Sequence, residues 1–238
     1  MKFAVIGDIH GNKYALEKAL IDINNKNVDF IISTGDLVGY MPYPNEVIKL
    51  IRKNNVIVVK GNHDKYISEC NKISTEIINK MADLEIQKSA SLAFTNWIIS
   101  DENRDYLKAL MNKLCIEHEG IKIVVVHGSP FLIDEYVYGN DNCLANIGKL
   151  VNEDVIICGH THIPYFKKIN NKYFINSGSI GKPKHGESLG TYVIVDILNG
   201  SVKCTIEKVE YDVELMIKDI ECNRMISNDL ISMLRKGI

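Results

Sequence analysis

The chain has 238 residues, of which 46% are hydrophobic and 24% are charged, and its formal net charge is -2. This length allows one large α/β domain with a substantial core, and it does not exclude two small domains. The near-balanced charge gives no overall support for binding to nucleic acid or to an anionic membrane surface, although a local basic patch stays open. No apolar stretch reaches the roughly 18 residues of a spanning helix, and the N-terminal apolar run is too short for a signal peptide. We therefore expect a cytoplasmic protein with no membrane association and no general nucleic-acid binding.

The six cysteines are scattered along the chain and form no CxxC pair. This spacing indicates neither a zinc ribbon nor a redox motif. In a chain without an export signal we expect reduced and mostly buried thiols. The residues are Cys70, Cys115, Cys143, Cys158, Cys204 and Cys222.

The first predicted element is a short buried strand at residues 3–7, where apolar and small side chains follow one another. The run ends in Asp8 and His10, two residues apart. Side chains two apart on an extended backbone point the same way, so this carboxylate and this imidazole can converge on one ion. A tight turn then leads into an amphipathic helix that begins near Lys13.

The second strand is predicted at residues 30–34, and it runs into Gly35 and Asp36. Two prolines keep residues 41–44 out of a helix, so residues 39–44 are a loop beyond the end of the strand. The loop carries Tyr40 and Tyr43 on the same rim as Asp36. The next helix begins at Pro44 or Asn45.

Three further strands also stop at turns with ligand-type side chains. Residues 56–59 precede Gly-Asn-His-Asp at 61–64, residues 121–126 precede His127, and residues 155–158 precede His160 and His162. Between the first two of these, the mixed polarity of residues 65–114 predicts two or three inserted helices.

The C-terminal part begins with a strand at residues 173–175, which runs into a small-residue turn at 176–181. Residues 192–197 and 202–209 predict a hairpin. A final helix is predicted from about residue 212 to Leu234, and it can pack on its own sheet or on a second subunit, so a homo-oligomer stays open. We predict a single domain over residues 1–238 with a helical insertion at about 65–114.

The polar turns point to one site, because ligands of open α/β sheets gather outside the carboxyl ends of the strands. Taken singly, an Asp after a strand is an ordinary turn residue, and a lone His is more often hydrogen-bonded than a ligand. Here five strands end in polar residues, and five of the seven histidines fall at those ends. Two carboxylates, four histidines and one carboxamide are too many ligands for one tetrahedral zinc. Mixed oxygen and nitrogen ligands with a bridging carboxylate suit two ions about 3.5 to 4 Å apart, which is typical of phosphate ester hydrolysis.

The motifs resemble those of the calcineurin-like metallophosphoesterase superfamily, in the same order along nearly the whole chain. The later segments, NSGSIGKP at 176–183 and the helix that YDVE begins at 211, look like those of small bacterial and archaeal phosphodiesterase-type members. The five motifs are GDIHGN (7–12), GDLVG (35–39), GNHD (61–64), VVHGSP (125–130) and GHTH (159–162).

The resemblance implies a four-layer αββα sandwich, with two mixed β-sheets packed together and helices outside. It implies that one metal is bound by Asp8, His10 and His162, that the other is bound by Asn62, His127 and His160, and that Asp36 bridges both. A water or hydroxide between the ions would be the nucleophile. His63 would be catalytic without ligating metal: it would protonate the leaving alkoxide or stabilise charge on the phosphoryl oxygens.

One departure from the phosphoprotein-phosphatase branch is informative. That branch follows GDxV with Asp and Arg, which orient the GNH histidine and grip phosphate, whereas this chain has Gly39 and Tyr40. Neither residue can perform those roles, so His63 needs another orienting partner or has none.

Other residues are candidates for substrate binding, each with an ordinary structural alternative. The tyrosines could stack a ring or simply lie on the rim, the small-residue turn could offer N–H groups or serve only backbone geometry, and the basic residues could hold phosphate or form a solvated loop. The candidates are Tyr40, Tyr43, Ser179, Lys182 and His185.

The leading hypothesis is an enzyme, a two-metal phosphodiesterase or phosphatase for a small phosphorylated molecule, with a nucleotide as one candidate. The absent Asp-Arg pair disfavours a serine/threonine-type phosphoprotein phosphatase or a dinucleoside polyphosphate hydrolase. A non-catalytic scaffold of the same fold is disfavoured because no ligand is missing. The two divalent ions could be Mn, Fe or Zn, which the sequence does not rank.

Overall fold

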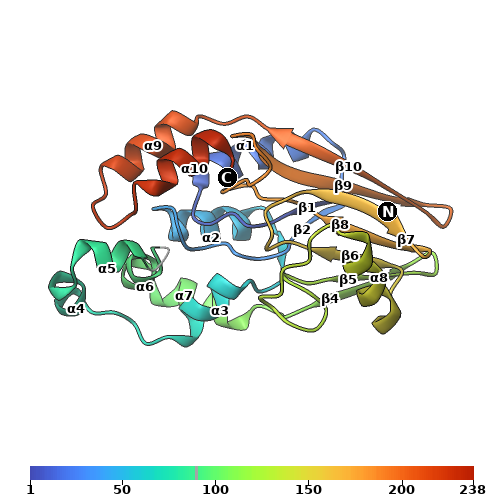
Figure 1. The fold of residues 1–238 in the computed structure, drawn as a ribbon, viewed down its shortest axis with the longest axis horizontal. Helices are drawn as coiled ribbons and strands as arrows, with labels where there is room; N and C mark the ends of the chain where they lie inside the picture. Colours follow the sequence, from blue (N-terminus) through green and yellow to red (C-terminus); the bar gives the residue numbers. More distant parts are fainter. Residues whose placement is uncertain (89–90) are drawn as a thin grey trace.

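The computed structural model describes residues 1–88 and 91–238 and contains two mixed five-stranded sheets packed face to face (Figure 1). In the first sheet, β1 and β9 pair antiparallel while β1 and β2 pair parallel; in the second, β5 and β6 pair parallel while β4 and β5 pair antiparallel. In spatial order the first sheet is β10 (Ser201–Val209), β9 (Gly190–Leu198), β1 (Lys2–Ile6), β2 (Phe30–Ser33) and β3 (Ile57–Val58), and the second is β4 (Leu114–His118), β5 (Ile121–Val125), β6 (Val155–Cys158), β8 (Lys172–Asn176) and β7 (Tyr165–Ile169).

Helices cover the outer faces of both sheets and complete the αββα sandwich, as expected. α1 (Lys13–Asn24) lies on the first sheet and α8 (Asp141–Leu150) on the second (Figure 1). The same apolar cluster as α1 also includes α2 (Pro44–Lys53), α9 (Val213–Glu221) and α10 (Asp229–Lys236).

The central strands are buried on both faces because their side chains alternate between two apolar layers. Phe3 and Val5 of β1 enter the core between the sheets, whereas Ala4 and Ile6 face the helix layer. This period of two is the geometry of a strand, and each large apolar side chain removed from water contributes about 1.5–3 kcal/mol. The doubly buried strands therefore form a rigid base for the loops at their ends.

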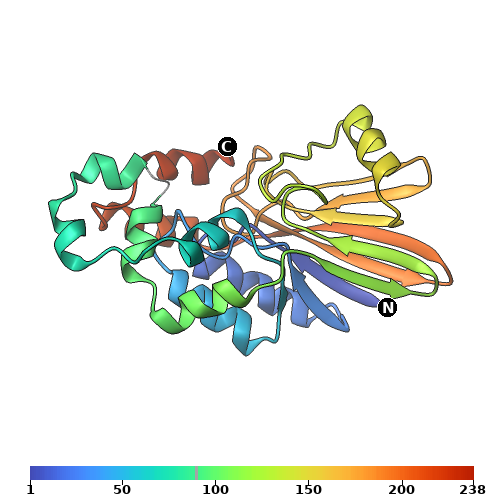
Figure 2. The ribbon, with the colours of Figure 1, turned by 90° about the horizontal axis from the view of Figure 1, so that it is seen from below.

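In its described residues the inserted segment contains five helices where two or three were predicted, and in Figure 2 it extends beyond one end of the sheets. The helices are short because caps interrupt them: Ser74 and Ser100 each accept a hydrogen bond from a backbone N–H three residues later. Arg104 ties this region together by donating to the carbonyl oxygens of Ile67, Cys70 and Asn96. The helices are α3 (Asn62–Glu69), α4 (Thr75–Lys80), α5 (Asp83–Lys88), α6 (Leu92–Ile98) and α7 (Asp101–Ala109).

The C-terminal segment was predicted as one helix, but it consists of α9 and α10. Residues 222–228 turn between them, and Asn223 contributes to this break because its Oδ1 accepts the N–H of Met225 at 3.1 Å. The turn buries Met225 and Ile226 against the helix layer. As a result, α10 folds back beside α9 rather than extending away from it.

All six cysteines are free thiols, but only Cys158 is buried, and Cys115 and Cys222 are exposed, which corrects the expectation of mostly buried thiols. Within the described residues we find no helix with the length and apolar character needed to cross a bilayer.

Candidate metal centre

The predicted ligands come from both sheets and meet where the parallel strands end. Asp8 and Asp36 follow β1 and β2 of the first sheet, and His127 follows β5 of the second. The carboxyl ends of parallel strands lie at one edge of a sheet, so packing the two sheets together brings these turns together. All seven predicted ligands are buried except Asn62, which is half-buried.

The backbone at these turns is left-handed, not extended. Asp8 has φ 50°, His10 has φ 52° and Asp36 has φ 53°, and His160 and His162 are similar at 64° and 61°. Left-handed backbone costs a non-glycine residue roughly 1–2 kcal/mol, and backbone hydrogen bonds such as His10 N–H to Asp36 O at 2.9 Å hold it in place. The expected convergence of Asp8 with His10 is present, but the expected reason, an extended strand, is wrong.

One group of ligand atoms consists of Asp8, His10 and His162. The Nδ1 of His10 donates to the carbonyl of Val38 at 3.2 Å, and the Nδ1 of His162 donates to the carbonyl of Lys182 at 2.6 Å. Because a carbonyl only accepts, each neutral imidazole is left with a lone pair on Nε2, and these two atoms lie 3.1 Å apart. The buried Oδ1 of Asp8 lies 3.3 Å from the Nε2 of His162 and has no hydrogen-bond partner in the described residues.

A second group repeats this arrangement on the other side. His127 donates from Nδ1 to the carbonyl of Thr34 at 2.9 Å, and His160 donates from Nε2 to the carbonyl of Asp134 at 3.1 Å. Their remaining nitrogens lie 3.2 Å apart, and the Oδ1 of Asn62 is 2.8 Å from the Nε2 of His127. Facing acceptors are stable together only with a cation between them, so the donor set in both groups fits metal ions.

Asp36 lies between the two groups. Its Oδ2 is 3.7 Å from the Nε2 of His10 and 3.4 Å from the Nε2 of His127. Burial alone would raise the pKa of Asp36, but the imidazoles of His127, His63 and His10 hold this pKa well below its usual range. Asp36 is therefore an anion placed to attract cations on either side.

The histidines respond to this anion in different ways. Burial lowers the pKa of His10 well below its usual value against the opposing attraction of Asp36. At His127, burial again lowers the pKa, but Asp36 and then Asp8 outweigh it and raise the value to about 9. The negative charge that favours a proton on His127 equally favours a metal cation at that nitrogen.

His63 stands beside the ligands without joining their carbonyl-anchored pattern. Its backbone N–H donates to the Oδ1 of Asp36 at 2.8 Å, but its ring Nδ1 has no hydrogen-bond partner in the described residues. The ring is packed between those of His10 and Tyr40, with centroid distances of 4.9 and 5.1 Å. A Cβ added to Gly39 would lie 2.3 Å from this Nδ1, so the imidazole packs directly against the Gly39 backbone.

Residues 1–200 match the calcineurin-like phosphoesterase superfamily domain. The chain belongs to this superfamily. It is 34% identical to an uncharacterized protein of Methanocaldococcus jannaschii over 93% of each chain. A probable metallophosphoesterase of the same organism is 37% identical over 77% of this chain and 70% of that protein. The crystal structure of a metallophosphoesterase from Sphaerobacter thermophilus covers 100% of this chain and 99% of its own, with a TM-score of 0.84 and 27% identity.

As a calcineurin-like phosphoesterase, the protein is a metal-dependent hydrolase of phosphate esters, and its buried His and Asp clusters are the chemical groups that such a hydrolase needs. The predicted superfamily and the predicted enzyme class are confirmed.

Of the candidate substrate residues, Tyr40 and Lys182 lie beside the centre. The ring of Tyr40 is 4.8 Å from that of His10, and the Nζ of Lys182 lies 5.2 Å from the Tyr40 centroid. Lys182 is only 4% exposed and forms no salt bridge within the described residues. Burial, together with the charge of Lys184, lowers the pKa of the Lys182 ammonium to about 8. The group is still a cation at neutral pH.

The other three candidates, Tyr43, Ser179 and His185, have different surroundings from those of Tyr40 and Lys182. Tyr43 donates its hydroxyl to Asp219 of α9 at 2.7 Å. Ser179 is fully buried and donates to the backbone carbonyl of Asp8 at 2.6 Å, so it supports the turn that carries this ligand. Both ring nitrogens of His185 are buried and without a partner in the described residues.

Sequence reasoning missed two kinds of supporting group. The carbonyls that fix the imidazole tautomers leave no signal in residue type. Asp64 ends the GNHD motif, and its carboxylate accepts the N–H groups of Leu37 and Gly61 at 2.9 and 3.0 Å. Burial and then the charge of Asp36 raise the pKa of Asp64 to about 7. Asp64 thereby links the turn after β2 to the start of α3, and its position next to His63 was the available signal.

Proposed function

We propose that the protein is a two-metal phosphodiesterase or phosphatase that acts on a small phosphorylated molecule. The observation that carries this proposal is the set of four imidazole lone pairs that face one another in two pairs across Asp36. Two ions, rather than one, are favoured because the two pairs have separate ligands and share only this carboxylate.

In the proposed assignment, Asp8, His10 and His162 hold one divalent ion, and Asp36 is shared. The other ion is held by Asn62, His127 and His160. A pair of divalent ions supplies the charge that activates a water molecule and neutralises the phosphoryl group. The role of the chain is to keep each imidazole in the tautomer that leaves its lone pair inward.

His63 is the proposed general acid. Burial lowers its pKa, and the surrounding imidazoles add to this against the attraction of Asp36, so the imidazolium is the minor form at neutral pH but a stronger acid than a free one. In this role it donates its proton to the oxygen of the leaving group, or a hydrogen bond to a phosphoryl oxygen. Lys182 is the proposed cation for phosphate, because it is buried beside Tyr40 and has no carboxylate partner in the described residues.

The close approach of Gly39 to His63 argues against a phosphoprotein phosphatase. An Asp at residue 39 would place its Cβ within 2.3 Å of the His63 ring, and the backbone there has φ 92°. The orienting carboxylate of that branch therefore has no room in this chain, which favours small phosphate esters over phosphoproteins.

The test is hydrolysis of bis(p-nitrophenyl) phosphate and p-nitrophenyl phosphate by the full chain loaded with Mn²⁺. We expect activity on at least one of them, and a loss of at least about 100-fold in His127→Ala, because losing a ligand costs at least as much as losing an outer-shell partner.

The matched control is His118→Ala. His118 lies at the end of β4, where its Nε2 is 3.5 Å from the N-terminal ammonium, outside both ligand groups. This variant should keep wild-type activity and metal content. A metal-loaded protein that is inert on both esters and faster on phosphopeptides would contradict the proposal.

A further inference from the structure

A cavity of about 530 Å³ opens beside the metal centre, between the inserted helices and the C-terminal helix. Tyr40 separates the cavity from the metal centre, because its ring packs against those of His10 and His63 and also lines the cavity. In Figure 1, α10 lies above α5 and α6, and residues of α5 and α10 line this cavity. The remaining described lining residues are Leu84, Gln87, Ser91, Ser227, Asn228, Asp229, Leu230 and Met233.

Contacts between α5 and the turn after α9 hold these two segments together beside the cavity. Gln87 donates to the backbone carbonyl of Arg224 at 2.7 Å, and Arg224 forms a salt bridge with Asp83 at 2.8 Å. At the other end of α10, Gly237 accepts the N–H of Gly186 at 2.9 Å. The cavity is thus built by two segments that are far apart in the sequence.

The hydroxyl of Ser91 is the observation that points to a ligand. Ser91 is 1% exposed, and its Oγ has no hydrogen-bond partner in the described part of the chain. Its backbone is left-handed with φ 57°, and although it begins α6 it makes no side-chain cap. A buried hydroxyl without a partner costs about 1–3 kcal/mol, which a bound polar group would recover.

The lining favours a neutral ligand with hydroxyl groups. Asp229 is a hydrogen-bond acceptor and repels anions, so the phosphate itself does not belong here. Leu84 and Met233 provide apolar contact beside the polar groups. Carboxylates commonly bind the paired hydroxyls of a ribose, and sugars and nucleosides combine such hydroxyls with an apolar face.

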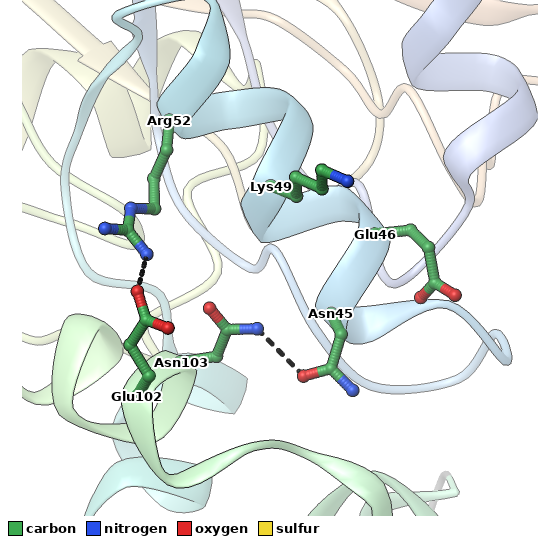
Figure 3. Close-up of a pocket in the computed structure, with 6 residues that line it drawn as sticks. All are labelled: Asn45, Glu46, Lys49, Arg52, Glu102 and Asn103. Atoms are coloured by element: carbon green, nitrogen blue, oxygen red, sulfur yellow. Dashed lines mark hydrogen bonds and ion pairs between the residues drawn. The ribbon is translucent and has the colours of Figure 1, made fainter.

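Two other cavities have linings that fit a neutral, hydroxyl-bearing ligand less well. Between α2 and α7, polar side chains pair with each other: Arg52 contacts Glu102 at 2.5 Å, and Asn103 donates to Asn45 at 2.9 Å (Figure 3). The cavity that includes His127 is lined by three lysines and only two carboxylates, so its net charge is positive; the charged residues are Lys60, Lys65, Lys113, Glu69 and Asp134.

We propose that the α5–α10 cavity binds one organic substituent of the phosphate ester, and that this substituent is an uncharged, hydroxyl-bearing group of the sugar or nucleoside type. The inference rests on the proposed function, because it places the phosphorus at the metal centre and the substituent beyond Tyr40. Ser91 and Asp229 are the specificity-determining residues.

The test measures binding to the metal-free full chain by saturation-transfer NMR, so it does not depend on hydrolysis. The probes are adenosine, methyl β-glucoside and benzyl alcohol. We expect adenosine or the glucoside to bind more tightly than benzyl alcohol. We expect Ser91→Ala to raise the Kd about fivefold and Asp229→Asn about tenfold, as for loss of a neutral and of a charged hydrogen bond.

The matched control is Glu46→Gln, which makes the same kind of change in the cavity of Figure 3 and should leave the Kd unchanged. Binding of adenosine alone identifies a nucleoside site, and binding of the glucoside alone identifies a sugar site. The proposal is overturned if neither binds, if benzyl alcohol binds as tightly, or if both variants bind like the wild type. A failure of the proposed function would instead appear as a lack of ester hydrolysis with intact binding.

Discussion

The metal centre and the α5–α10 cavity lie on either side of Tyr40 but are built in different ways. The centre is made of turns at the ends of doubly buried strands, and a backbone carbonyl anchors each of the four imidazoles proposed as ligands. The cavity is lined by short helices, and the side chain of Leu84 in its wall is 61% exposed. Contacts of Arg224 with Gln87 and Asp83 connect α5 to the C-terminal segment. In this account the rigid metal centre carries out the reaction and the cavity selects the substrate. The lining of the cavity can change at little cost to the free energy of folding.

The largest effect should come from the carboxylate shared by the two ligand groups. Asp36→Asn removes the negative charge between them, so we expect metal content to fall and kcat/KM for bis(p-nitrophenyl) phosphate to drop at least about 100-fold. Elemental analysis together with steady-state kinetics measures both. Asp105→Asn, an exposed change on α7, is the control, and equal metal content in the two variants would refute the role of Asp36.

The next effect concerns His63, which belongs to the centre but is not a proposed ligand. His63→Asn should lower kcat by about 10²–10⁴, as expected for loss of a general acid, while metal content stays at the wild-type level. Measuring kcat and bound metal on the same sample separates the two roles. Loss of metal in this variant would instead make His63 a ligand.

A smaller effect is expected where the packing around His63 is tightest. Gly39→Ala should lower stability by about 1–3 kcal/mol in urea unfolding and reduce kcat, because its Cβ displaces the His63 ring. Gly120→Ala is the matched control: it also has a positive φ, of 75°, but nothing lies within 4 Å of an added Cβ. Its stability should fall while kcat stays unchanged, and equal kcat in the two variants would show that Gly39 does not position His63.

The smallest effect should come from the salt bridge between Arg224 and Asp83, which connects α5 to the turn after α9. Arg224→Ala removes an exposed salt bridge, so the global stability should change by less than about 1 kcal/mol. Amide hydrogen exchange in α5 should nevertheless become faster, since this helix loses one of its attachments to the C-terminal segment. Faster exchange in β1 as well would mean that the two regions are not mechanically separate.

The sequence predicted the strands of the first sheet and the central strands of the second, but it missed both edge strands of the second sheet, β4 and β7. β1 and β6 are continuous apolar runs, whereas β7 carries Lys167 and Lys168 and β4 alternates with exposed Glu117, so neither edge strand was predicted. The mixed polarity that disguises an edge strand is also what protects it from pairing with other chains. The break between α9 and α10 was missed because the apolar spacing continues through the turn.

The meeting of the proposed ligands could be predicted, but the backbone that holds them could not. Residue types at strand ends pointed to these side chains, and the structure brings them together. Their left-handed backbone depends on hydrogen bonds between turns that are remote in sequence, such as Asp8 N–H to Gly35 O at 2.9 Å. The hydroxyl of Tyr43 likewise binds Asp219, a partner that no local pattern indicates.

The most direct test of this account is the anomalous difference map of a crystal soaked in Mn²⁺. We predict two peaks about 3.5 to 4 Å apart, one beside Asp8, His10 and His162 and the other beside His127 and His160, with Asp36 in contact with both. A single peak, or peaks that leave one of the two imidazole pairs without a cation, would contradict the central claim.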